Sequence, residues 1–198
     1  MSGLKLLKTK LSNGSANEAN TGSRQARRNG FTLVELLTVV AIIFTVAAIG
    51  VPKLITAIRV DRVRSGAAAI LSVVQQARSY AVQKNTTVNV YRGAVAGGNS
   101  GAFADTTGSG SSFSNGDIYS SYPANVTTGT SSSAPSGLTS SLIGFTASSS
   151  TSLSFNSLGT ASAGVVYYVT DAYGDWAAVS VSPLGRSKVW VWNGAQWQ

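Results

Sequence analysis

Glu35 is the residue of this sequence whose chemistry most needs an explanation. It is the one charged residue in the apolar run between Phe31 and Val51, and it follows Phe31 by four positions. A carboxylate costs about 2.5–3.5 kcal/mol at the centre of a membrane helix and less near the end of the helix. An apolar anchor gains nothing from this charge, so Glu35 predicts a function beyond anchoring.

The side chains that most often carry out chemistry are missing from the sequence. It contains no Cys and no His, which excludes disulfides and thiolate metal sites and removes the usual general base and the commonest metal ligand. Its serines have no His or Lys at the spacing of a nucleophile–base motif. The acids past Glu35 are Asp61, Asp105, Asp117, Asp171 and Asp175. We therefore expect no enzymatic activity, no cofactor and no metal site.

Glu35 must be positioned by a long apolar helix. At about 1.5 Å per residue, residues 31–51 form a helix of roughly 30 Å, which is enough to cross the hydrocarbon core of a bilayer. Residues 1–30 are polar and basic and carry much of the net charge of +8. A basic leader favours a cytoplasmic N-terminus. Four cations just past the apolar run weaken this rule: Lys53, Arg59, Arg62 and Arg64.

The junction between the leader and the apolar run carries a specific motif. Residues 30–35 read GFTLVE, Pro52 closes the segment, and the whole resembles the class III signal of type IV pilins and type II secretion pseudopilins. A secretory signal peptide would have its apolar core before the cleavage site, and a plain transmembrane anchor would not explain the motif. The resemblance implies that a prepilin peptidase cuts between Gly30 and Phe31, that Phe31 is then N-methylated, and that Glu35 acts in filament assembly.

A second, amphipathic helical stretch is expected over residues 53–85. Apolar residues recur there at spacings of three and four and form one stripe: Val63, Ala67, Ile70, Val74, Ala77 and Ala81. Pro52 cannot donate a hydrogen bond to the carbonyl four residues before it, so we expect a kink at this position. The pattern predicts one long helix, whose first half (residues 31–52) is a membrane and filament-core segment and whose second half packs on a head.

The head is expected to be β-rich over residues 86–198, because the period changes there from helical to alternating. Strands are predicted at 86–91, 153–158, 165–170, 176–181 and 188–192. An insert at residues 93–152 is rich in Gly, Ser and Thr with short apolar islands, which predicts long loops and weak strands. The fold class is α+β, with a long N-terminal helix packed on an antiparallel sheet, the layout of pilins.

The head resembles the GspH/FimT family. The similar segments are QARSYAVQKN at 76–85, LSFNSLG at 153–159 and VSVSPLGR at 179–186. This resemblance implies a minor pilin or pseudopilin at the tip, or in the initiation, of a type II secretion pseudopilus or type IV pilus. Its partners would be other pilin subunits, the prepilin peptidase and the inner membrane. We expect a single-pass protein with a cytoplasmic N-terminus and a periplasmic head.

DNA binding is the alternative function. Some FimT-type members bind DNA during natural transformation through a C-terminal Gly-Arg-x-Arg motif, and residues 185–188 of this chain read GRSK. Lys188 in the last position keeps the charge of an Arg but loses its planar fork. Three tryptophans follow, at Trp190, Trp192 and Trp197. Exposed, they could stack on bases beside Arg186 and Lys188; the alternating pattern fits equally a strand on which they cover the sheet.

Asp171 and Asp175 flank a turn that contains Gly174. Two carboxylates around a glycine turn could belong to a calcium loop, but calcium takes six to eight oxygen ligands and the spacing of an EF-hand is absent. We therefore expect a solvated hairpin turn at this position.

Overall fold

A long helix, α1 (Leu33–Lys84), opens the part of the chain that the structure describes. The computed structural model describes residues 30–148 and 152–198, so the predicted leader lies outside it up to residue 29. α1 is 52 residues long and continues through Pro52; the kink expected there stays a prediction. The helix is shared by two units, one that ends at Phe44 and one that begins at Thr45.

Backbone hydrogen bonds fix the C-terminal end of α1. Asn85 has a φ of 51°, in the left-handed region that Asn tolerates better than most residues. Its N–H donates to the carbonyl of Val82 at 3.4 Å, and the N–H of Thr86 donates to the carbonyl of Ala81 at 3.1 Å. This pair of bonds is a Schellman motif, which satisfies the last carbonyls and turns the chain out of the helix.

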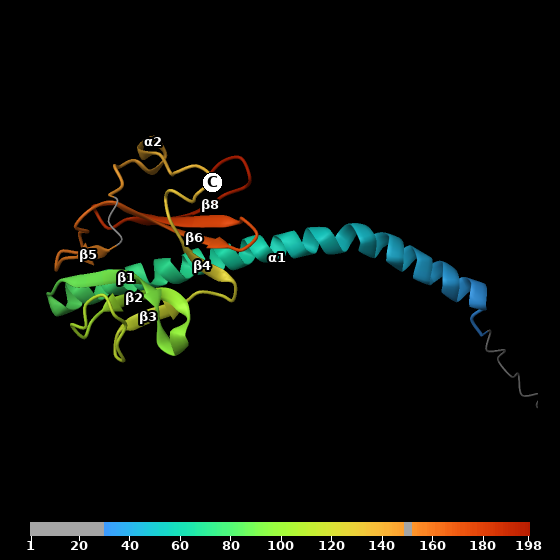
Figure 1. Cartoon of the computed structure of the whole chain (residues 1–198), viewed down its shortest axis with the longest axis horizontal. Helices are drawn as coiled ribbons and strands as arrows, with labels where there is room; N and C mark the ends of the chain where they lie inside the picture. Colours follow the sequence, from blue (N-terminus) through green and yellow to red (C-terminus); the bar gives the residue numbers. More distant parts are fainter. Residues whose placement is uncertain (1–29, 149–151) are drawn as a thin grey trace, which may run out of the picture. The chain divides into compact units, whose positions relative to one another are not determined.

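Two antiparallel sheets of four strands each form the head, where the sequence pattern predicted one (Figure 1). The first sheet has the order β3 (Ile118–Ser121), β2 (Ser100–Asp105), β1 (Val88–Ala94) and β5 (Leu153–Phe155). The second has the order β4 (Val126–Gly129), β6 (Val165–Asp171), β7 (Trp176–Val181) and β8 (Ser187–Val191). The connections contain a 3-10 helix, η1 (Ala96–Gly98), and a one-turn helix, α2 (Ser140–Ile143).

The insert at residues 93–152 contributes strands to both sheets. It supplies β2 and β3 to the first sheet and β4 to the second, where Gly129 lies opposite Tyr168 of β6. Gly, Ser and Thr give little local periodicity, so composition alone predicted loops. Pairing with strands elsewhere in the sequence makes these segments strands, because strand formation depends on cross-strand neighbours more than on intrinsic preference.

The core lies where the second half of α1 meets both sheets (Figure 1). All six residues of the predicted apolar stripe are buried, as the helical spacing required. They form one cluster with β1 and β5 of the first sheet and with β6 and β7 of the second; among its largest members are Ile70, Leu153, Phe155 and Tyr167. The fold class predicted from the sequence is confirmed, with two sheets in place of one.

The second sheet is covered on its other face as well. Tyr168, Trp176 and Trp190 form a separate buried cluster there with Leu138 from the insert and Trp197 from the C-terminal tail. The Tyr168 hydroxyl accepts a hydrogen bond from the Leu138 N–H at 3.0 Å. Every residue of β7 is consequently buried, and the insert forms part of the packing of the head.

Val74 and Val82 give a matched test of this core, because both lie on α1 and their exposed fractions are 1% and 50%. Val74→Ala should lower the free energy of unfolding by about 2 kcal/mol, since it deletes buried methyl groups and leaves a cavity. Val82→Ala should change it by less than about 0.5 kcal/mol. Denaturant unfolding followed by tryptophan fluorescence measures both values; equal losses would contradict the burial of this helix face.

Candidate functional site

The predicted processing residues lie together at the start of α1. Gly30 and Phe31 precede the helix and are exposed, and Phe31 has an exposed fraction of 77%. Thr32 caps the helix, because its Oγ1 accepts a hydrogen bond from the N–H of Glu35 at 3.2 Å. Thr32 and Glu35 thus occupy the positions of a capping box. We did not predict this cap, although the spacing of Thr32 and Glu35 in the sequence is its usual signal.

The position of Glu35 gives it a local role. It lies in the first turn of α1, where a negative charge interacts favourably with the positive end of the helix dipole. Such a charge contributes about 0.3–1 kcal/mol when it is exposed. The side chain is exposed in the structure, so the carboxylate remains accessible to a partner outside the chain.

Apolar side chains are exposed along the first half of α1. They include Leu33, Leu37, Ile42, Phe44, Ile49 and Leu54. Within the described residues, α1 is the helix that is long and apolar enough to cross a membrane, with a mean hydropathy of 2.5 over its most apolar window. Such a surface needs lipid or other helices around it.

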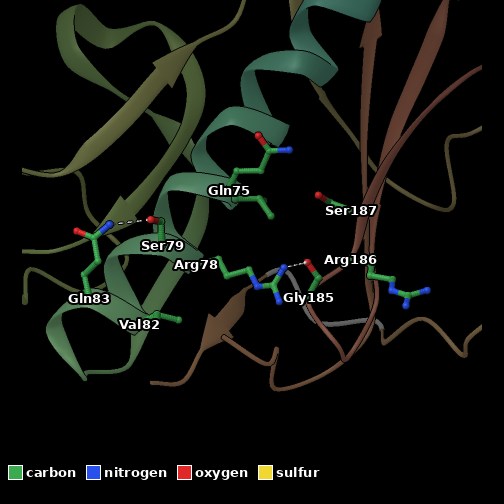
Figure 2. Close-up of a pocket in the computed structure, with 9 residues that line it drawn as sticks. Gln75, Arg78, Ser79, Val82, Gln83, Gly185, Arg186 and Ser187 are labelled. Carbon is green, nitrogen blue, oxygen red and sulfur yellow. Dashed lines mark hydrogen bonds between the residues drawn. The ribbon is translucent and has the colours of Figure 1, made fainter. Parts of the chain in front are cut away.

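Arg78 holds together the segments that carry the head resemblance (Figure 2). Its Nε donates to the carbonyl of Gly159 at 2.9 Å, and its Nη1 donates to the carbonyl of Gly185 at 3.2 Å. A longer bond of 3.4 Å runs from Nη2 to the carbonyl of Leu184. One guanidinium on α1 therefore positions the turn after β5 and the turn between β7 and β8.

Arg78 and the two glycines whose carbonyls it binds, Gly159 and Gly185, are called the Arg78 clasp below. The geometry of the clasp requires glycine at both positions. Gly159 and Gly185 have φ values of 73° and 75°, where other L residues are strained. A Cβ on Gly185 would lie 2.6 Å from the carbonyl oxygen of Gly159 and 2.9 Å from Arg78 Nε. Both glycines lie in the segments that carry the family resemblance. The role of Arg78 as their partner could not be predicted, because its acceptors are backbone carbonyls, which every residue has.

A groove of about 710 Å3 lies beside this clasp, lined by α1 residues and by residues 185–187 (Figure 2). Its charged side chains offer little to a ligand, because the Arg78 guanidinium is engaged by carbonyls. The Arg186 side chain extends away from α1 in Figure 2. The Arg78 guanidinium is therefore not free to bind a ligand in this groove, and Arg186 is the other charged residue among the described residues that line it.

Arg186 and Lys188, the candidate DNA-binding residues, are both exposed and lie around the start of β8. They line a second groove of about 390 Å3 together with the segment 142–145 and Trp190. Lys188 Nζ lies 3.5 Å from the centre of the Trp190 ring. The Lys188 ammonium group thus makes a cation–π contact with a residue of its own strand, β8.

Two of the three tryptophans expected as possible stacking partners for bases cover the sheet, and the third, Trp192, is partly buried against the same cluster. Trp190 and Trp197 have exposed fractions of 5% and 7%. Their Nε1 atoms donate to Ser180 Oγ at 2.8 Å and to the carbonyl of Ser136 at 2.6 Å. Base stacking needs exposed rings, and two cations alone make few phosphate contacts, so the geometry does not favour DNA binding.

The residues around Asp171 and Asp175 form the turn of the β6–β7 hairpin. Asp171 Oδ1 accepts hydrogen bonds from the N–H groups of Tyr173 and Asp175 at 2.9 and 3.0 Å. Burial and the nearby Asp171 raise the pKa of Asp175, and Arg59 partly offsets this. In the part of the chain that the structure describes, no group of three or more His, Cys, Asp or Glu side chains is placed to hold a metal ion.

Comparison with known families identifies both halves of the chain. The model described as type II transport protein GspH matches residues 66–185, which is more than half of the sequence, and the prokaryotic N-terminal methylation motif matches residues 25–51. The chain belongs to the GspH family. It is a minor pilin or pseudopilin of the type II secretion and type IV pilus class, whose members are structural subunits that assemble with other such subunits.

One solved structure shows a similar protein. It is the type IV minor pilin FimU of Pseudomonas aeruginosa, with 15% sequence identity and a TM-score of 0.46, over 70% of this chain and 93% of that one. No curated protein matches the sequence. The methylation motif and the apolar start of α1 fit a membrane-anchored member of the GspH family.

Gly185→Ala should destabilise the head of this GspH-family protein by about 3 kcal/mol or more, because positive φ and a backbone clash act together. Gly194→Ala is the matched control: Gly194 has a φ of 93°, but a Cβ there meets nothing within 4 Å. Gly194→Ala should lower the free energy of unfolding by about 1 kcal/mol. The two midpoints of thermal unfolding give the comparison, and similar shifts would mean that the Arg78 clasp does not restrict residue 185.

Proposed function

We propose that this protein is made as a prepilin, is processed at Gly30, and enters a type II secretion pseudopilus or type IV pilus as a tip or initiation subunit. The observation that carries the proposal is the start of α1, where an exposed Gly-Phe junction precedes an exposed apolar helix with one carboxylate in its first turn. The match to the N-terminal methylation motif supports the same interpretation.

In this proposal each segment has a separate role. Residues 1–30 are a leader in the cytoplasm, and residues 31–52 hold the protein in the inner membrane with the head in the periplasm. Residues 53–85 continue the helix into the head, and residues 86–198 form the β-rich part. The buried second half of α1 supports this division, because it belongs to the core of the head.

Processing requires access to the backbone at Gly30. The residue precedes the first helical turn, and a Cβ built there meets nothing within 4 Å of the described chain. Any restriction on this position therefore comes from the peptidase, which approaches a residue without a side chain more closely. Cleavage creates a new amine on Phe31, which the same processing pathway methylates.

Glu35 acts in assembly by neutralising the amine of Phe31 on a neighbouring subunit. In the filament, the lipid contacts of residues 31–52 are replaced by contacts between helices. An unpaired charge in such a low-dielectric environment is costly, whereas a charge with a hydrogen-bonded partner of opposite sign is tolerated. The exposed carboxylate of Glu35 is available for this contact.

The N-terminus of the protein from its native host tests the processing step. Mass spectrometry should show a chain that begins at Phe31 and carries one added methyl group. Gly30→Glu should block cleavage, since a long charged side chain occupies the space that the peptidase needs, while Gly30→Ala should still be cut. Cleavage at another position in the wild-type protein would overturn the prepilin assignment.

Glu35→Gln tests the charge of Glu35 separately from its role in the helix, because Gln retains the shape and the capping ability of Glu. We expect normal membrane insertion but a loss of incorporation by more than about 100-fold, since a buried amine is left unpaired. Thr32→Ala is the control: it removes the cap and keeps the carboxylate, so incorporation should persist. The amount of each variant in sheared filaments is the measurement, and normal entry of Glu35→Gln would rule out the pairing.

A further inference from the structure

Arg92 is a cation placed on the inward face of the first sheet. It lies on β1, where the alternating positions Val88 and Val90 are fully buried. Its Nη1 donates to the carbonyls of Gly129 and Tyr168, each at 3.3 Å. These acceptors belong to β4 and β6, so the side chain reaches from one sheet to the other.

The charge of Arg92 has no counter-charge beside it among the described residues. Its guanidinium carbon lies 4.5 Å from the centre of the Tyr167 ring, and burial lowers the pKa of Arg92. Burial in turn raises the pKa of Tyr122 to about 12 and raises the pKa of Tyr167 as well. Both phenols are therefore neutral at physiological pH and supply no negative charge.

One donor of the same guanidinium is unused. Among the described residues, Arg92 Nε is buried without a hydrogen-bond partner. Buried donors are nearly always satisfied in proteins, and an exception points to a water, an ion or a ligand at the site. The three residues between the two described ranges, 149–151, are Ser, Ser and Thr, so none of them carries a carboxylate.

A cavity of about 370 Å3 opens beside Arg92. Its polar lining includes the hydroxyl-bearing residues Thr130, Ser131 and Ser148, and its apolar walls include Leu138 and Val166. Most of this lining comes from the Gly, Ser and Thr-rich insert, whose composition predicted no role. The volume lies at the lower end of the range of ligand pockets, about 300–1,000 Å3, so an amino-acid side chain or a chain end can enter, and the single cation suits a single negative charge.

We propose that this cavity binds a protein carboxylate, with Arg92 as the residue that recognises it. A guanidinium matches the planar geometry of a carboxylate. The carbonyls of β4 and β6 engage Nη1 of Arg92, and Nε has no hydrogen-bond partner among the described residues. The carboxylate belongs either to an Asp or Glu side chain or to the C-terminus of a docked chain. Binding does not depend on filament assembly, since any protein partner could supply the group.

The test uses the full-length protein in a nonionic detergent. N-acetylglycine stands for a chain terminus, and N-acetylaspartic acid with its main-chain carboxyl blocked as a methylamide stands for a side chain. At ten times the dissociation constant, the ligand that fits should raise the melting temperature by about 3–6 °C relative to chloride at equal ionic strength. The uncharged N-acetylglycinamide should leave the melting temperature unchanged. The acid that gives the larger shift shows whether the bound carboxylate comes from a chain terminus or from a side chain.

Two variants assign the effect to Arg92. Arg92→Gln should abolish the shift, and Arg92→Lys should weaken binding by about tenfold or more, because Lys lacks the planar fork. Arg62→Gln, which removes an exposed Arg of α1, should leave the shift unchanged. If Arg92→Gln does not fold, the NMR signal of Arg92 Nε–Hε in the 15N-labelled wild-type protein serves as the readout instead. This signal should shift when the acid is titrated into the protein. No stabilisation by either acid, or an equal shift in Arg92→Gln, would leave Arg92 as a contact between two sheets only and would overturn the proposal.

Discussion

The exposed apolar face of α1 places a condition on the whole protein. Large apolar side chains from Phe31 to Ile58 are exposed, and leaving such a side chain in water rather than burying it costs about 1.5–3 kcal/mol. Lipid or the helices of other subunits must therefore surround this stretch. The head has no such requirement, because its helix and its two sheets bury a common core. The first half of α1 thus exposes its apolar side chains, whereas the second half buries its own in the core of the head.

Two arginines of the head are held by contacts with the backbone. Arg78 binds carbonyls of two turns, and Arg92 binds carbonyls of two strands. Every residue has a carbonyl, so these contacts place no demand on the side chains of the acceptors. The acceptor residues must, however, let the guanidinium approach closely. Gly159 and Gly185 meet this requirement because they have no side chain. The head therefore holds both guanidinium groups through carbonyl oxygens and needs no carboxylate side chain for this purpose.

Local patterns predicted those features that depend on local spacing. The stripe from Val63 to Ala81 followed from the helical period, and the strands β6, β7 and β8 followed from alternation between turn residues. The second sheet could not be derived in this way, and alternation at residues 188–192 allowed buried tryptophans without deciding between burial and exposure. Both depend on which distant segment lies against β6 and β8, and Gly, Ser and Thr in the insert carry little information about that choice. The sequence gives only a weak indication that Arg92 points inward: it follows Val88 and Val90 at alternate positions of the same strand.

The cover over the second sheet is held by a few anchors. Leu138 packs into the buried cluster, its N–H binds Tyr168, and the Ser136 carbonyl accepts from Trp197. Residues 130–135, before these anchors, form a loop of mostly polar residues, and doubling the length of a flexible loop costs only about 0.6 kcal/mol. Residues in this loop can therefore change in number and identity with little loss of stability. This gives the protein an outer surface that can diverge rapidly in evolution while the scaffold beneath it stays the same.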